Sequence, residues 1–228
     1  MPRSVLPFEN MAEMLEQLGG IDPGRIRSWP PPGKATEKDV ISILNRENRL
    51  YELVDGVLVE KTMGLKESMV AGYLVRVLGV FADEHDCGAV AGADGTLKLM
   101  RKLIRIPDVS FFTWDRLPGK MYPSEPIPDL YPDLAVEVLS AGNTAREIER
   151  KLKEYFLSGT RLAWIVDLAT RTVAVHTAPD RFVTLAEHDA LDGGDVLPGF
   201  TLPLKDLFAH VPRPTPRKAK SPKRKNGK

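Results

Sequence analysis

The chain has 228 residues, 43% of them hydrophobic, which is enough for one good-sized domain with extra segments. Its single cysteine, Cys87, excludes an intrachain disulfide, and no Cys or His cluster with metal-ligand spacing is present. No apolar run approaches the length of a membrane span, and residues 1–10 lack the apolar core of a signal peptide. We therefore expect a cytoplasmic protein.

The net charge of +1 hides an uneven distribution along the chain. Residues 211–228 hold 8 of the 32 Lys and Arg residues and no acid, so the rest of the chain keeps 24 basic against 31 acidic residues, a net charge of −7. A proline-rich basic tail cannot bury enough apolar surface to fold, so we expect it to be disordered. It would either bind a polyanion by counterion release or simply aid solubility.

The first part of the chain predicts a short helix and a linker. Apolar residues recur at helical spacing within residues 8–18, and a proline-rich break follows at 27–34. Thr36 and Asp39 have the spacing of a capping box that opens a helix over 37–45. We therefore divide the chain into an N-terminal helix and linker (1–35), a main domain (36–210) and the basic tail (211–228).

The middle of the chain predicts two hairpins and a long helix. Residues 49–63 form two β-rich runs around Asp55-Gly56, and a second pair of runs flanks Asp94-Gly95. The helix between them is expected over 65–85, and a further strand over 105–114.

Residues 134–167 have the length of a strand–helix–strand unit, with Thr144 as the cap of a helix that runs to about residue 158. A strand over 172–177 and a short helix over 204–210 follow. This order predicts an α/β or α+β fold, with a mixed central β-sheet flanked by helices and one right-handed parallel crossover.

Glu137 lies in the middle of the apolar strand 134–140. Both faces of this strand are apolar, as in a central strand covered by helices. A buried carboxylate must be paired, protonated or bound to a cation, because an isolated buried charge is costly. A buried salt bridge with a nearby Lys or Arg and a metal site both satisfy this requirement.

Asp108 is a second acid among apolar residues, directly after Pro107. Proline suits a strand end or a bulge, and bulges are common beside active sites, although a turn aspartate is an equally ordinary role. Two carboxylates in one cleft repel each other, and a hard divalent cation such as Mg²⁺ relieves that repulsion.

Lys151 lies at the edge of the buried stripe of the predicted helix after Thr144. It is the charge of that helix best placed to reach inward. The alternative is a lysine whose stem covers the core while its ammonium stays in water.

Several motifs together resemble one family. They are "YELVDG" (51–56), "IPDV" (106–109), "PDLAVEVLS" (132–140), "NT" (143–144), Lys151 with Tyr155, Gly159, "WIVD" (164–167) and "GDVLPGF" (194–200). The family is the Uma-two family of restriction-endonuclease-like proteins, a branch of the PD-(D/E)XK nuclease superfamily. The likeness extends over roughly residues 36–209.

The resemblance implies a restriction-endonuclease-like core and metal-dependent cleavage of phosphodiester bonds in DNA. It implies that Asp108 and Glu137 hold Mg²⁺ or Mn²⁺. The usual lysine two positions after the second acid is replaced by Leu139, and the resemblance implies that Lys151 takes over its role. The acid of the first motif would fall on Glu67, with Glu52 as a rival.

Two other classes of function remain open at this point. One is a catalytically inactive nucleic-acid-binding or regulatory protein on the same fold. DNA-binding proteins usually present a basic face, so the basic tail or a basic cleft would have to supply what the acidic body lacks. The other is a two-carboxylate hydrolase acting on sugars, for which an aromatic content of 7% is low. Cutting both strands of a duplex would favour a homodimer.

Overall fold

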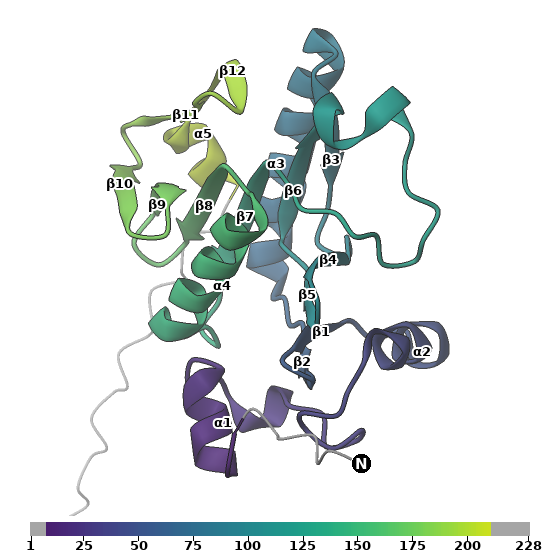
Figure 1. Ribbon diagram of the computed structural model, residues 1–228. Helices are drawn as coiled ribbons and strands as arrows, with labels where there is room; N and C mark the ends of the chain where they lie inside the picture. The colour runs from purple at the N-terminus through teal and green to yellow at the C-terminus, as the bar shows by residue number, and fades with distance from the viewer. Residues whose placement is uncertain (1–7, 211–228) are drawn as a thin grey trace, which may run out of the picture.

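The structure is a computed structural model that describes residues 8–210. The tail 211–228, for which we expect disorder, lies outside the described residues. The helices, shown in Figure 1, are α1 (Met11–Gln17), α2 (Glu37–Glu47), α3 (Leu65–His85), α4 (Ala145–Ser158) and α5 (Leu204–Ala209). No helix in this part of the chain is long and apolar enough to cross a membrane.

Within residues 8–210 the strands form three sheets. The four-stranded sheet has the order β2–β1–β5–β4, the six-stranded sheet the order β10–β9–β8–β7–β6–β3, and β11 pairs with β12. The strands are β1 (Tyr51–Val54), β2 (Val57–Glu60), β3 (Gly88–Ala91), β4 (Leu97–Met100), β5 (Leu103–Arg105), β6 (Val109–Thr113), β7 (Leu134–Leu139), β8 (Leu162–Asp167), β9 (Thr172–Ala178), β10 (Arg181–Ala186), β11 (Ala190–Gly193) and β12 (Leu197–Pro203).

The six-stranded sheet is mixed, as the sequence predicts. Strands β7 and β8 are parallel and are joined through α4, whereas the other neighbouring strands are antiparallel. Leu134, Val136 and Val138 pack into the core formed with α3, and Glu137 points to the opposite face, where α4 lies. Figure 1 shows α3 and α4 on opposite sides of β7. Strand β7 is therefore the central strand covered on both faces that the sequence predicts.

The local signals for turns and caps are confirmed. Asp55 and Gly56 both have positive φ values, 52° and 80°, which suit the tight hairpin between β1 and β2. Thr36 and Asp39 form the capping box of α2. The Thr144 side chain accepts a hydrogen bond from the Glu147 backbone N–H and so caps α4.

The second predicted hairpin is wrong. Strand β3 pairs with β6 and strand β4 with β5, so the two strands around Asp94-Gly95 belong to different sheets. A side chain at Gly88 would collide with the backbone of Phe112 and the ring of Phe111. The glycine lets β3 approach β6 closely, and this long-range pairing replaces the local one.

The strand expected over 105–114 is divided in the structure. Strand β5 ends at Arg105 in the four-stranded sheet, and β6 begins at Val109 in the six-stranded sheet. Pro107 lies between them and has no N–H to offer to a ladder. Residues 106–108 therefore carry the chain from one sheet to the other.

The N-terminal segment packs against the main domain. Met14, Leu18 and Ile21 are buried in one apolar cluster with residues of β2 and α4. The Thr144 hydroxyl donates a hydrogen bond of 2.5 Å to the Gly19 carbonyl, at the first turn of α4. The boundary between residues 35 and 36 stays a prediction.

We predict that Gly19→Ala destabilises the protein more than Gly20→Ala. Both glycines have positive φ, 86° and 71°, so an L side chain at either position costs about 1–2 kcal/mol. Only at Gly19 would the new Cβ collide with α4, 2.5 Å from the Glu147 backbone nitrogen, which adds about 1–3 kcal/mol. Urea unfolding of both variants measures the difference, and equal losses would contradict the contact.

Candidate functional site

Glu137 is the central acid of a buried ion cluster. Its carboxylate, 4% exposed, lies on the α4 face of β7. Lys151 of α4 donates hydrogen bonds to both oxygens, with Nζ–O distances of 3.0 and 2.9 Å, and the Tyr155 hydroxyl donates to Oε1 at 2.5 Å. Lys151 and Tyr155 are four residues apart and therefore share one face of α4.

Asp108 is held beside Glu137 by the pairing of β6 with β7. Its backbone N–H donates to the Val136 carbonyl at 2.9 Å, and its Oδ2 accepts from the Val138 N–H at 2.6 Å. These two bonds attach Asp108 to the residues on either side of Glu137. The two acids that the sequence singles out are thus brought to one place.

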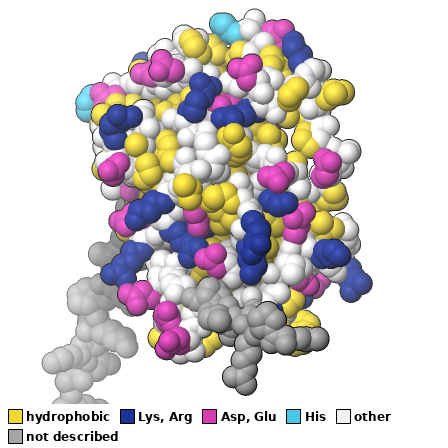
Figure 2. All heavy atoms as spheres, in the orientation of Figure 1, with side chains coloured by type: hydrophobic (Ala, Val, Ile, Leu, Met, Phe, Trp, Pro, Cys, Tyr) yellow, Lys and Arg dark blue, Asp and Glu magenta, His cyan; other side chains and the backbone are white. Residues whose placement is uncertain are grey.

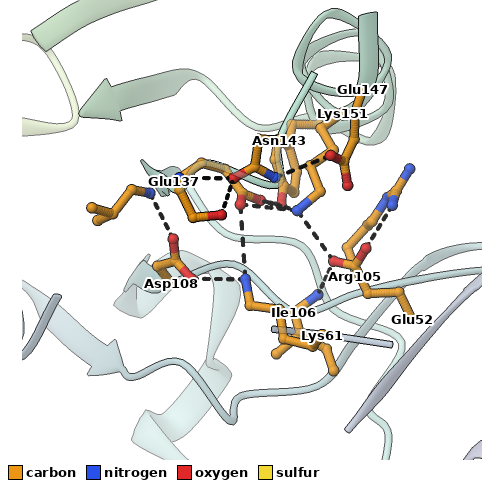
Figure 3. Close-up of polar contacts among 12 residues, drawn as sticks. Glu52, Lys61, Arg105, Ile106, Asp108, Glu137, Asn143, Glu147 and Lys151 are labelled. Atoms are coloured by element: carbon orange, nitrogen blue, oxygen red, sulfur yellow. Dashed lines mark hydrogen bonds and ion pairs between the residues drawn. The ribbon is translucent and has the colours of Figure 1, made fainter. Parts of the chain in front are cut away.

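Lys61 lies between the two carboxylates (Figure 3). Its ammonium is 2.7 Å from Asp108 Oδ1 and 3.8 Å from Glu137 Oε2, and its side chain is 7% exposed. Lys61 follows directly after β2 and continues the inward alternation of Val57 and Val59. The four-stranded sheet thus supplies a cation to acids of the six-stranded sheet.

Glu52 and Arg105 extend the cluster along the four-stranded sheet. Glu52 accepts a hydrogen bond of 2.7 Å from Arg105 and one of 3.2 Å from the Ile106 backbone N–H. Its Oε1 is also 3.4 Å from Lys151 Nζ. The guanidinium of Arg105 also donates to Glu154 of α4. Helix α4 therefore contacts acids or cations of both large sheets.

The surroundings give the carboxylates different proton affinities. Burial raises the pKa of Glu137, but the positive charges of Lys151 and Lys61 outweigh it, and the pKa falls below its usual value. The pKa of Glu52 is lowered in the same way by Lys151 and Arg105. Burial dominates at Asp108 and raises its pKa, against the opposing charge of Lys61. Asp108 is therefore the acid of this cluster that takes up a proton most readily relative to its ordinary value.

The structure brings together three of the four predicted site residues, Asp108, Glu137 and Lys151. Glu67 lies half-buried in the first turn of α3, and no hydrogen bond or ion pair within residues 8–210 joins it to the cluster. Its rival Glu52 is a full member.

Sequence reasoning missed Lys61, Arg105 and the hydroxyl of Tyr155. For the two basic residues a signal was present. Lys61 lies two residues after Val59 and therefore on the same inward face of the hairpin as Val57 and Val59. Arg105 shares its face with the buried Leu103 of β5. To recognise these residues from the sequence, one must know which face of each sheet carries the acids. Long-range contacts between the two sheets determine that face.

The carboxylates of the cluster suit a hard divalent cation, although they are already paired with the lysine and arginine side chains of the cluster. Among residues 8–210, no group of three or more His, Cys, Asp or Glu side chains is arranged to hold a metal ion. Asp108 and Glu137 nevertheless face one shared positive charge, the ammonium of Lys61. Carboxylate oxygens are the ligands that Mg²⁺ and Mn²⁺ prefer. A cation of either kind fits the chemistry of this position.

Comparison with known proteins assigns the class. The fold is similar to that of a solved structure described as a putative nuclease belonging to DUF820 from Anabaena variabilis ATCC 29413, with a TM-score of 0.63 and 20% sequence identity. The match covers 72% of this chain and 92% of the other. No curated protein matches the chain.

The family model named Uma2, described as "putative restriction endonuclease", matches residues 35–205. The chain therefore belongs to the Uma2 family, with a nuclease fold and a nuclease-like function. The resemblance seen in the sequence and the predicted fold class are confirmed.

We predict that Lys151→Met lowers the free energy of unfolding by about 3–5 kcal/mol, because it leaves Glu137 and Glu52 without their shared buried partner. Lys153→Met is the matched control, since Lys153 is exposed on the same helix, and it should change stability by no more than about 0.5 kcal/mol. Denaturant unfolding compares the two variants. A Lys151→Met protein as stable as the control would mean that the ion pairs are energetically neutral.

Proposed function

We propose that this protein is a metal-dependent endonuclease that hydrolyses phosphodiester bonds in DNA. The observation that carries the proposal is the position of Asp108 and Glu137 on either side of one buried cation. Membership of the Uma2 family supports the same conclusion.

We assign Asp108 and Glu137 as the residues that would hold Mg²⁺ or Mn²⁺. When bound, such an ion activates water as a nucleophile and neutralises the phosphate. Val138 N–H orients Asp108 through its hydrogen bond, and Tyr155 and Lys151 orient Glu137. Lys151 would also supply positive charge near the reacting phosphate.

For the acid of the first motif we propose Glu52 rather than Glu67. Glu52 contacts both Lys151 and Arg105 and is fully buried in the cluster. Its role would be to hold Lys151 from the side opposite Glu137, because the ammonium lies within 3.4 Å of both carboxylates.

The alternative function is a catalytically inactive nucleic-acid-binding or regulatory protein. One observation favours it: the acids are already satisfied by Lys61, Lys151 and Arg105. Figure 2 shows basic and acidic side chains interspersed on the face that it draws, which favours neither function over the other. The two functions differ in whether DNA is cut.

We propose DNA as the substrate and a homodimer as the form that would cut both strands of a duplex. The cytoplasmic location expected from the sequence stays a prediction.

We predict metal-dependent nicking of supercoiled plasmid by the wild-type protein, in Mg²⁺ or in Mn²⁺, and none in EDTA. Glu137→Gln should lower the rate by at least about 100-fold, because it removes charge from the reacting centre. Glu149→Gln is the matched control, since Glu149 is an exposed acid on α4 outside the cluster, and it should cut as the wild type does. Gel analysis of time courses gives the rates.

The controls of this experiment separate the two functions. Equal cutting by Glu137→Gln and wild type would point to a contaminant or to another site. Binding of DNA by folded wild-type protein without cutting in either metal would favour the binding protein.

We predict that deletion of residues 211–228 weakens DNA binding and flattens its salt dependence. The tail carries 8 basic residues, so full engagement would contribute up to about 7 to the slope of log K against log salt concentration. Fluorescence anisotropy at several salt concentrations measures the slope. An unchanged slope in the truncated protein would show that the tail does not contact DNA.

A further inference from the structure

Lys61 differs from the other two cations of the cluster in its place in the fold. Lys151 lies on the buried face of α4 and is fixed by two carboxylates, Glu137 and Glu52. Arg105 is fixed in the same way by Glu52 and Glu154. Lys61 spans Asp108 and Glu137. It is the cation that lies between the two acids to which we assign metal binding.

The chain leaves the sheet directly after Lys61. Its backbone N–H donates to the Leu50 carbonyl at 3.0 Å, so the Cα is held at the end of the β-hairpin. The next residues are largely exposed, including Leu65 with 79% of its surface accessible. The four-carbon stem of lysine is flexible, and its ammonium is strongly hydrated in water. Lys61 as a residue is partly exposed whereas Lys151 is buried, so an exit of the ammonium toward solvent is shorter from Lys61 than from the helix face that carries Lys151.

The charges of the cluster explain why this exit matters. Glu52, Asp108 and Glu137 face three cations, those of Lys61, Lys151 and Arg105. A fourth acid, Glu154, also contacts Arg105 and is balanced by Arg150 at 2.7 Å, so the group as a whole is neutral. A divalent ion added to this neutral group would leave two uncompensated positive charges in a buried site, which is costly. If the ammonium of Lys61 leaves as the ion enters, a single positive charge remains. One phosphodiester group carries the single negative charge that neutralises it.

We propose that Lys61 is an exchangeable counterion. Its ammonium holds Asp108 and Glu137 together in the metal-free protein and leaves the carboxylates when a divalent cation binds. This inference rests on the proposed function, because it takes these two acids as the metal ligands. Lys61 then lowers the metal affinity of the free protein by competing for the same oxygens, and it is a positioning residue rather than a catalytic one.

The first test is Mn²⁺ binding to the full chain without DNA, measured by titration calorimetry. Lys61→Met keeps the length of the side chain but removes its charge, and it should bind Mn²⁺ at least about tenfold more tightly than wild type, within the usual range of coupling between two ligands. Lys61→Arg keeps the charge and should bind no more tightly than wild type. Lys66→Met is the matched control, since Lys66 is exposed at the start of α3.

The second test uses the wild-type chain and needs no variant to fold. Labelling of lysines with an amine-reactive reagent, read by mass spectrometry, should show Lys61 protected without metal and more reactive in Mg²⁺. Lys66 should react equally in both conditions. If Lys61→Met does not fold, this measurement decides alone.

The outcomes distinguish the exchange of Lys61 from metal binding itself. Equal Mn²⁺ affinity in wild type and Lys61→Met, with Lys61 labelling unchanged by Mg²⁺, would overturn the exchange while metal binding stands. No Mn²⁺ binding by any of the proteins would overturn both the exchange and the metal dependence of the proposed function.

Discussion

One buried ammonium connects the two main sheets of this protein. Lys151 reaches Glu137 of the six-stranded sheet and Glu52 of the four-stranded sheet, with 2% of its side chain exposed. A charge at that depth is tolerated only with its partners in place. The position of α4 therefore depends on how the two sheets lie relative to each other. The same holds for residues 106–108, which connect β5 of one sheet with β6 of the other.

The two acids that contact Lys151 each have further partners in the cluster. Each acid that faces Lys151 needs further partners, because one ammonium cannot satisfy two buried carboxylates. Glu52 obtains them from Arg105 and the Ile106 N–H, and Glu137 from Tyr155. The hydrogen-bonded groups come from strands, from α4 and from the short segment 106–108 between β5 and β6. The site is thus built on regular elements and on a segment that two strands hold at both ends, which fixes its geometry more tightly than a mobile loop would.

Local sequence signals were sufficient for most elements but not for their long-range partners. The Asp55-Gly56 turn, the caps of α2 and α4 and the apolar run of β7 each specify their own geometry within a few residues. The pairing of β3 with β6, which brings Gly88 against the Phe111 ring, is a long-range contact that local pattern does not contain. The same limit applies to the site. Asp108, Glu137 and Lys151 stand out because they interrupt apolar patterns, whereas Lys61 and Arg105 resemble ordinary strand-end residues until the sheets are assembled.

Six charges lie in one buried place, and stability does not account for them. Replacing buried ion pairs by well-packed apolar residues is often neutral or stabilising, so stability alone does not require them. The strand β7 is otherwise wholly apolar between Leu134 and Leu139, and β6 carries Val109 and Phe111 beside Asp108. Asp108 and Glu137 lie together with the Lys61 ammonium between them. Their carboxylate oxygens are suited to binding a cation, which is the use that we propose for them.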